Sequence, residues 1–387
     1  MTSSTTDGST PALWIASFAT TDPSFGALTP TRLFPNFPIA VLQAERITGS
    51  PTLMVRHVST IKASPLLQAT SLNTIEIWPG FDVKALKKIW MDGKFVDWAD
   101  ANIHVLTHGL HYGLAVFEGI RAFSTPDGPA VFRLDPHVER FFNSAKIYRM
   151  DLGYSMKEIT SACVDFVRQN NVKEVYIRPI AYTAYGEMGL NPLNSKISVA
   201  IAGWEWGPYL GKDGGDKGVR ATVSSWVRID PRALPLQAKC SANYANSALA
   251  KMEALSAGYD EAILLNSHGV VAEGPGENIF RVKDDILSTP PASSGILRGI
   301  TRDTIIQFAH DLGIKFYRND SSKEELYTSD EVFFSGTAVG VAKVREIHGR
   351  KIGYNGTPVT DKIQKLYGEV VHGKAKRYSK WLTPVRA

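Results

Sequence analysis

Cysteine is scarce in this chain: its 387 residues include only two, Cys163 and Cys240. Two cysteines form no disulfide framework, and neither lies in a metal-binding spacing, which predicts a reducing compartment. No apolar run approaches the ~18 residues that a membrane-spanning helix needs. A strong charge of one sign is also missing, because the net charge is +5 and the basic residues are scattered among acids. We therefore expect partners that are neither nucleic acid nor membrane.

The first 80 residues have few acids, are rich in Ser, Thr and Pro, and are only weakly periodic. One interpretation is a disordered leader, which predicts a cytoplasmic protein. The other is an organelle-targeting extension, because Arg32, Arg46 and Arg56 lie among hydroxyl residues. That alternative predicts the matrix of a mitochondrion or plastid. A secretory signal is disfavoured, since no basic segment precedes a clean apolar core.

The length of the chain predicts two domains. Periodic sequence begins near Lys88, and residues 88–206 are the expected small N-terminal domain. Residues 207–218 are rich in glycine and are the clearest linker in the chain. They lack the Gly-Lys-Ser/Thr ending of a nucleotide-binding loop, which leaves the role of an interdomain loop. Residues 219–387 are the expected large C-terminal domain.

Hydrophobic periodicity and turn residues predict the elements of both domains. Residues 88–96 form a predicted hairpin whose turn is Asp92-Gly93. The other predicted strands are residues 116–123, 129–134, 175–180, 197–202, 218–227, 261–265, 270–273, 279–282 and 331–334. The predicted helices are residues 137–145, 157–170, 246–255 and 304–312.

Three histidines, His104, His108 and His111, follow one another at a helix-like spacing that could suggest a metal site. No nearby cysteine or acid completes a ligand set. Gly109 and Gly113 argue against a regular helix here. We therefore predict no metal.

Lys239 follows a proline-stiffened turn and precedes the small residues Cys240, Ser241 and Ala242. A strand is predicted before this segment and a helix after it, which places Lys239 at a strand-to-helix junction with room for a flat group. A lysine in a loop is ordinarily solvated, so this position alone does not indicate a site. Its predicted partners decide the interpretation.

Those partners are a carboxylate, a helix start and a strand end. Glu273 precedes a glycine turn, and residues 299–301 (Gly-Ile-Thr) open a predicted helix whose free N–H groups suit an anion. Residues 336–338 (Gly-Thr-Ala) end a strand. Each feature is common alone. Together with Lys239 they match the needs of pyridoxal phosphate, which are a lysine for the Schiff base, an acid for the pyridinium and a helix end for the phosphate.

From about residue 89 to residue 385 the chain resembles the branched-chain-amino-acid aminotransferases, which are class IV, fold-type IV pyridoxal-phosphate enzymes. The matching motifs occur in the family's order at residues 108–113, 117–121, 176–179, Lys239 with 243–244, 273–278, Leu297 with 299–303, and 335–338. The resemblance implies an α/β fold of the α+β type, with two α/β domains joined by the glycine-rich loop. It also implies a homo-oligomer that is at least a dimer.

The resemblance implies the cofactor contacts. Lys239 would form the Schiff base and shuttle the proton, Glu273 would pair with the pyridine nitrogen, and Tyr244 would bond to the ring oxygen. The other residues that would contact the cofactor, at its phosphate, on its ring face or through nearby backbone, are Arg140, Leu297, Gly299, Ile300, Thr301 and Thr337.

The resemblance also implies the substrate contacts. Thr337 and Ala338 would offer backbone N–H groups to the substrate carboxylate. Arg178 would take the distal carboxylate of glutamate, and Tyr112 would enter from a partner subunit. The side-chain pocket would be shaped by Phe117, Gly119, Tyr176, Trp206 and Tyr209.

The implied reaction moves the amino group of L-leucine, L-isoleucine or L-valine to 2-oxoglutarate. Residues 339–344 differ from the family's Ala-Glu-Ile-Thr-Pro-Val pattern and Pro275 is unusual, so the preference among donors stays open. A D-amino-acid aminotransferase or an aminodeoxychorismate lyase would share Lys239 and Glu273. Residues 117–119 and 176–179 favour the branched-chain type. A non-catalytic relative that only binds pyridoxal phosphate is the alternative of another class.

Overall fold

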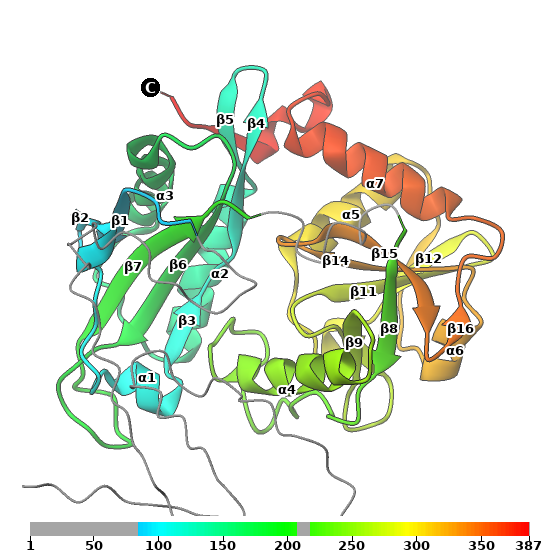
Figure 1. The fold of residues 1–387 in the computed structure, drawn as a ribbon, viewed down its shortest axis with the longest axis horizontal. Helices are drawn as coiled ribbons and strands as arrows, with labels where there is room; N and C mark the ends of the chain where they lie inside the picture. The colour runs from blue at the N-terminus through cyan, green and yellow to red at the C-terminus, as the bar shows by residue number, and fades with distance from the viewer. Residues whose placement is uncertain (1–83, 207–216, 387) are drawn as a thin grey trace, which may run out of the picture. The chain divides into compact units, whose positions relative to one another are not determined.

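Two β-sheets with helices packed against them organise the chain, as expected for an α/β fold (Figure 1). The structure is a computed structural model that describes residues 84–206 and 217–386. Both sheets belong to one unit of the chain, Ile77–Ala387. The predictions for residues 1–80, for Tyr209 and for nearly all of the linker 207–218 lie outside the described residues.

The first sheet has eight strands that all pair antiparallel. The predicted hairpin over Asp92-Gly93 is confirmed, with Met91 opposite Lys94. In spatial order the strands are β17 (Leu382–Pro384), β5 (Gly128–Phe132), β4 (Ile120–Thr125), β6 (Val175–Thr183), β7 (Ile197–Trp204), β1 (Lys88–Met91) and β2 (Lys94–Asp97), and β3 (Ala115–Phe117) pairs with β6.

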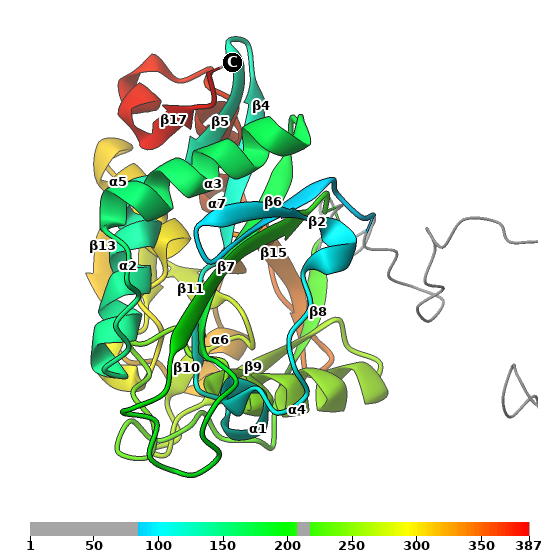
Figure 2. The ribbon, with the colours of Figure 1, turned by 90° about the vertical axis from the view of Figure 1, so that its left-hand side faces the viewer.

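Two long helices, α2 (Leu134–Ile147) and α3 (Met156–Asn170), pack together against this sheet (Figure 2). Their apolar stripes bury Phe141 and Phe166 completely, and each buried aromatic side chain contributes about 1.5–3 kcal/mol. Helix α3 begins at a capping box, in which Ser155 and Glu158 bond to each other's backbone N–H groups. Both helices were predicted, with shorter bounds.

The strand predicted across residues 116–123 is wrong, because the chain forms β3 and β4 with Glu118 and Gly119 between them. The neighbouring strand β6 explains the break. It carries Pro179, which has no N–H group to donate to a partner strand. Pro179 lies opposite the interruption, and its carbonyl oxygen accepts a hydrogen bond of 2.8 Å from the Glu118 N–H. The interruption leaves Glu118 and Gly119 free to serve a site.

The second sheet has nine strands, in the order β10-β9-β8-β15-β14-β11-β12-β13, with β16 paired to β15. Three pairings are parallel and the rest antiparallel. The strands are β8 (Val219–Val223), β9 (Glu261–Leu265), β10 (Val271–Glu273), β11 (Asn278–Lys283), β12 (Ile286–Thr289), β13 (Phe316–Arg318), β14 (Glu331–Gly336), β15 (Gly340–Ile347) and β16 (Arg350–Lys351).

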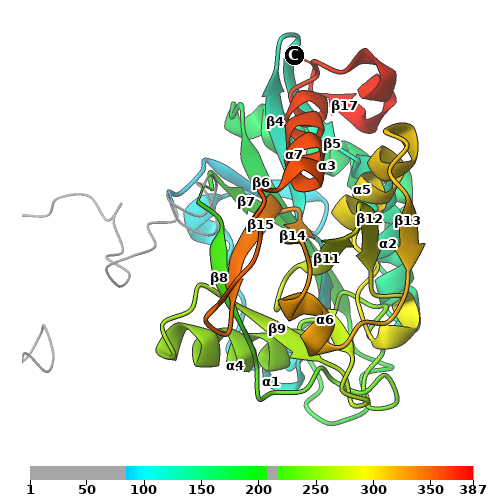
Figure 3. The ribbon, with the colours of Figure 1, turned by 90° about the vertical axis from the view of Figure 1, so that its right-hand side faces the viewer.

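Helices α5 (Ile300–Asp311) and α7 (Pro358–Val371) pack on this second sheet, and Figure 3 shows them beside β14 and β15. Helix α4 (Asn243–Ser256) packs on β9, and the short α6 (Lys323–Tyr327) precedes β14. The remaining short helices are α1 (His108–Tyr112) and three 3-10 turns at Trp98–Asp100, Ala292–Ser294 and Lys376–Trp381. None of the helices in the described ranges is both long and apolar enough to cross a membrane.

Three predictions near the site needed correction. The strand before Lys239 is shorter and more distant than expected, because β8 ends at Val223 and an irregular loop leads to the start of α4 at Asn243. The helix predicted from Thr304 begins earlier, at Ile300. The glycines near residue 110 do not prevent a helix, since α1 forms there and ends at Gly113 with a positive φ of 71°.

A shared core joins the two sheets. Phe123 and Phe132 of the first sheet pack with Phe280, Phe308 and Tyr367 of the second half. At the chain's end, β17 returns to the first sheet and pairs with β5. Side chains of both halves therefore reach one pocket.

Candidate active site

A pocket of about 690 Å³, part of it open to solvent, is lined by residues of both sheets. Most of the predicted cofactor and substrate residues line it: Gly119, Arg140, Tyr176, Lys239, Tyr244, Glu273, Leu297, Gly299, Ile300, Thr301, Thr337 and Ala338.

The loop that carries Lys239 is held by the first half of the chain. The Lys239 carbonyl accepts a hydrogen bond of 2.9 Å from the Phe117 N–H, and its own N–H donates to Ser144 Oγ at 3.0 Å. Cys240 forms an isolated β-bridge with Val116. These contacts from β3 and α2 hold the backbone of Lys239 in place at the pocket.

The Lys239 side chain is partly buried, and its Nζ lies 2.5 Å from the Tyr244 hydroxyl oxygen. The same Nζ lies 5.0 Å from the ring centres of Phe117 and Tyr244. Burial, helped by the positive charge of Arg140, lowers the pKa of Lys239 to about 8. More of this amine than of an ordinary lysine is therefore unprotonated near neutral pH, as a nucleophile or a base requires.

Arg140 is anchored by Glu118, which is fully buried. Glu118 accepts hydrogen bonds from Arg140 Nε at 2.6 Å, Arg140 Nη2 at 2.9 Å and His137 Nδ1 at 2.7 Å. Burial favours the neutral acid, but Arg140 and His137 outweigh it and hold the pKa of Glu118 far below its ordinary value. Arg140 Nη1 also donates to the Arg298 carbonyl at 3.0 Å. Glu118 belongs to the motif at residues 117–121, but neither its role nor that of His137 was predicted from the sequence.

Gly119 is required by the close approach of Tyr176. A Cβ at this position would lie 1.9 Å from the Tyr176 hydroxyl oxygen, so no larger residue fits without displacing that ring. The break between β3 and β4 thus brings a bare backbone against an aromatic wall of the pocket.

Glu273 ends β10 and is buried beneath the pocket. Its Oε1 pairs with Arg228 Nη2 at 2.9 Å, and its Oε2 accepts from Asn278 Nδ2 and the Leu297 N–H, both at 3.0 Å. Burial raises the pKa of Glu273, and Arg228 opposes that rise. A further cation or N–H donor in the pocket would find a carboxylate held in place. Arg228 carried no signal in the sequence, because its contact is with a residue 45 positions away (273 − 228).

The start of α5 faces the pocket through Gly299, Ile300 and Thr301. The N-cap residue, Gly299, has no side chain to cap this helix, so the first N–H groups are available to an anion at the positive end of the helix dipole. Gly299 is needed here because a Cβ would lie 2.0 Å from Asn278 Oδ1.

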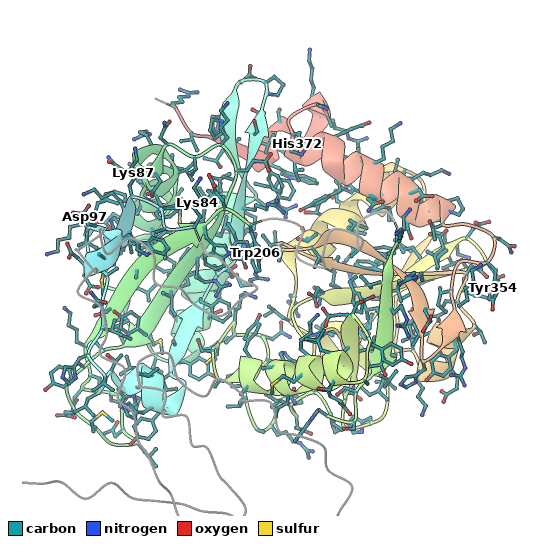
Figure 4. All side chains as sticks on the ribbon, in the orientation of Figure 1. Lys84, Lys87, Asp97, Trp206, Tyr354 and His372 are labelled. Carbon is teal, nitrogen blue, oxygen red and sulfur yellow. The ribbon has the colours of Figure 1, made fainter. Side chains whose placement is uncertain are left out.

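The other predicted substrate residues lie close to the pocket without lining it. Arg178 stacks its guanidinium 4.6 Å from the Phe117 ring and 5.3 Å from the Trp204 ring, and its Nε is buried without a hydrogen-bond partner in the described chain. Trp206, labelled in Figure 4 where the chain leaves β7, packs edge-on to Tyr176 at 4.8 Å. The predicted Phe117 contacts Lys239, as described above.

Tyr112 is not in the pocket of its own chain. It lies on α1 with 41% of its surface exposed, and its ring packs against His108 at 4.6 Å. This placement agrees with the expectation that Tyr112 serves another subunit, and it does not test that expectation.

The residues present fit pyridoxal phosphate. The Lys239 amine of lowered pKa suits the aldehyde of that cofactor, the anchored Arg140 and the uncapped helix start suit its phosphate, and the buried Glu273 carboxylate suits its ring nitrogen. Two of the glycines that line the pocket, Gly119 and Gly299, keep its walls free of Cβ atoms where neighbouring side chains approach most closely.

Comparison with known proteins matches the family model of the class IV amino-transferases to residues 115–347. The branched-chain-amino-acid aminotransferase of Pseudomonas aeruginosa is 45% identical over 299 residues, which cover 77% of this chain and 97% of the relative. The crystal structure of branched-chain aminotransferase from Thermoproteus uzoniensis with norvaline has a TM-score of 0.75 and 44% identity, with 78% and 100% of the two chains covered. The branched-chain amino acid aminotransferase from Thermobaculum terrenum, solved in its PLP-form, has a TM-score of 0.73 and 35% identity, with 78% and 99% covered.

Proposed function

The chain belongs to the class IV aminotransferases, and among them to the branched-chain-amino-acid aminotransferases, and from that premise we propose the roles of its residues. The proposed reaction moves the amino group of L-leucine, L-isoleucine or L-valine to 2-oxoglutarate and uses pyridoxal phosphate. The observation that carries the proposal is the Lys239 amine, 2.5 Å from the Tyr244 hydroxyl, in one pocket with Glu273 and the start of α5.

Bound pyridoxal phosphate supplies an electron sink for the charge that develops at the substrate Cα. Lys239 is the nucleophile and the base, because its lowered pKa leaves free amine near neutral pH. Arg140 and the N–H groups of Ile300 and Thr301 would hold the phosphate, and Leu297 would lie against the ring. Glu273 would keep the ring nitrogen protonated, while Arg228, Asn278 and the Leu297 N–H hold the carboxylate in position.

The pocket has to accept an aliphatic side chain in one half-reaction and glutamate in the other. Burying a leucine side chain contributes about 1.5–3 kcal/mol, whereas an unpaired buried carboxylate costs more than that. Tyr176 supplies an apolar wall, and just outside the pocket Trp206 packs against Tyr176 and Phe117 packs against Tyr244. Arg178 supplies the cation for the distal carboxylate, because its Nε has no other partner in the described chain. Thr337 and Ala338 take the α-carboxylate through their backbone N–H groups.

We further propose a homo-oligomer of at least two subunits. An apolar surface surrounds Tyr112: large hydrophobic side chains are exposed in residues 103–112 and again in residues 185–193. The two segments touch, since His108 Nε2 bonds to the Gly189 oxygen at 2.6 Å and Thr107 bridges to Tyr185. A continuous apolar surface of this kind favours contact with another protein surface, and a second copy would bring Tyr112 to the neighbour's pocket.

A cytoplasmic location fits the cysteines, which are both free and buried. The matrix alternative rests on residues 1–80, which lie outside the described residues.

The proposed function is tested by half-reactions of the purified holoenzyme, followed in the visible band of the bound cofactor. We expect L-leucine to convert the band and D-alanine and (R)-amines to leave it unchanged. Conversion by D-alanine instead would favour a D-amino-acid aminotransferase. If the protein binds the cofactor but none of these amines converts its band, the protein is a non-catalytic relative.

A further inference from the structure

A second cavity shares Gly299 and Ile300 with the active-site pocket. It has about 980 Å³ of space, part of it open to solvent. Four arginines line it, namely Arg133, Arg298, Arg302 and Arg318, and Asp303 is the single acid among its lining residues. The mechanism proposed above uses none of these side chains.

The positive charge of this cavity is mostly uncompensated. Asp303 pairs with Arg133 at 2.6 Å. Arg302 is buried and donates only to neutral oxygens, Thr289 Oγ1 at 3.3 Å and the Pro290 carbonyl at 2.9 Å. Within the described ranges no carboxylate forms a salt bridge with Arg298, Arg302 or Arg318. Burial, with Arg318 adding a like charge, lowers the pKa of Arg302 to about 10. A ligand of negative charge would relieve this repulsion.

Arg133 provides a donor that has no partner. Its side chain is nine-tenths buried, its guanidinium stacks 4.7 Å from the Trp381 ring, and Nη2 is taken by Asp303. Its Nε is buried with no hydrogen-bond partner in the described part of the chain. Buried donors are nearly always paired in folded proteins, so an unpaired one in the wall of a charged cavity points to a ligand.

We propose that this arginine cavity binds a phosphate dianion, either free or as the terminal phosphoryl group of a small metabolite, in addition to the phosphate held in the active-site pocket. Planar guanidinium groups match the oxygens of a phosphate, and three of them lack an anionic partner. The positive end of α5, a helix of 12 residues, adds to the attraction. The proposal does not depend on transamination, because anion binding is measured without substrate.

The test is titration calorimetry of the full-length holoenzyme with inorganic phosphate, at an ionic strength held constant with chloride. The bound cofactor keeps the active-site phosphate position filled, so we expect one phosphate per chain with an unchanged cofactor band. Arg318→Gln and Arg298→Gln, both at exposed positions, should each weaken binding by about tenfold or more, since each removes a charged donor. The matched control is Arg345→Gln, because Arg345 is an exposed arginine of β15 that does not line the cavity.

A parallel titration with glycerol phosphate separates the two sources of the anion. Tighter binding of the ester than of phosphate assigns the site to a phosphorylated metabolite, and the reverse assigns it to the free ion. The proposal is overturned if neither anion binds, if phosphate displaces the cofactor band in step with binding, or if Arg318→Gln and Arg345→Gln bind alike.

Discussion

Arg228 Nη2 lies 2.9 Å from Glu273 Oε1, and both side chains are buried. A buried carboxylate tends to take up a proton, and burial does raise the pKa of Glu273. Arg228 opposes this with its charge, while Asn278 and the Leu297 N–H occupy the other oxygen. The carboxylate is thereby held in one position and gains from any further positive partner, as a protonated ring nitrogen would be.

Glu273→Gln tests that role. The amide keeps the size of the side chain but cannot stabilise a positive ring nitrogen, so we expect the cofactor to stay bound. Deprotonation of the substrate Cα should slow by about 10²-fold or more. Single-turnover kinetics with L-leucine give this rate. The control is Glu346→Gln, at a carboxylate that pairs with Arg220 outside the pocket, and it should keep the single-turnover rate of the natural protein. An unchanged rate in Glu273→Gln would show that another acid serves the ring nitrogen.

Lys239→Ala should abolish transamination, because it removes the pocket amine whose pKa is lowered to about 8. Lys239→Arg keeps the positive charge but offers no free amine near neutral pH, so it should be equally inactive. Lys146→Ala, at an exposed position on α2, is the control and should be active. The measurement is steady-state turnover of L-leucine with 2-oxoglutarate. Substantial turnover in either Lys239 variant would refute the assignment.

Arg178→Ala should harm the dicarboxylic substrate more than the aliphatic one. Removing a charged hydrogen-bond donor costs about 1.5–3 kcal/mol, which corresponds to roughly 10- to 150-fold in kcat/KM for glutamate or 2-oxoglutarate. Leucine has no distal carboxylate, so its kcat/KM should change less, with some loss from the stacking of Arg178 on Phe117. Equal losses for both substrates would place the carboxylate contact elsewhere.

Mixing two inactive variants tests the shared site. Tyr112 lies on the exposed α1, outside the pocket of its own chain. Tyr112→Phe and Lys239→Ala proteins should each be impaired and should recover partial activity when refolded together, because a mixed dimer contains one site with both natural residues. Each protein refolded alone is the control. Mixed oligomers without recovered activity would contradict the contribution of Tyr112 to a neighbouring site.

Glu277 should make stability depend on pH. It is buried, the charges of Glu261 of β9, Lys251 of α4 and Glu273 of β10 act on it, and its carboxylate accepts the Gly276 N–H at 3.0 Å. Burial, with Glu261 adding a like charge, raises its pKa from 4.5 to about 8. Between these values the folded chain binds a proton that the unfolded chain has lost. The contribution of Glu277 to the free energy of unfolding should therefore be largest below pH 4.5 and should decrease as the pH rises toward 8.

Glutamine has no proton to lose, so Glu277→Gln should remove that part of the decline. Urea unfolding between pH 5 and pH 9 should show the variant gaining at least ~1 kcal/mol relative to the natural protein across this range. Glu325→Gln, at a partly exposed helix-capping carboxylate, is the control and should follow the natural profile. If the free energy of unfolding of Glu277→Gln changed with pH in parallel with that of the natural protein, Glu277 would be ionised in the folded protein.

Local elements were predictable where neighbours in the sequence determine them. The Asp92-Gly93 hairpin, the two long helices after residue 133 and the strand pair at residues 261–273 are all present. Turn residues, helix caps and apolar periodicity act over a few positions, so the sequence alone reveals them. Lys239, Glu273 and the start of α5 were found in the same way, from motifs of a few residues each.

What only the tertiary structure decided are the contacts between distant segments. The split of residues 116–123 depends on Pro179 in another strand, the pairing of Glu118 with Arg140 depends on α2 packing beside β3, and Arg228 reaches Glu273 across the second sheet. Similarly, the arginine cavity brings together residues from the start of α2, the loop after β12, α5 and β13 that form no motif in the sequence. Such contacts are set by the packing of whole elements, and no local pattern of residue types specifies them. The sequence by itself therefore determined the chemical groups of the site, and the fold decided which of them meet and which charges stay without a partner.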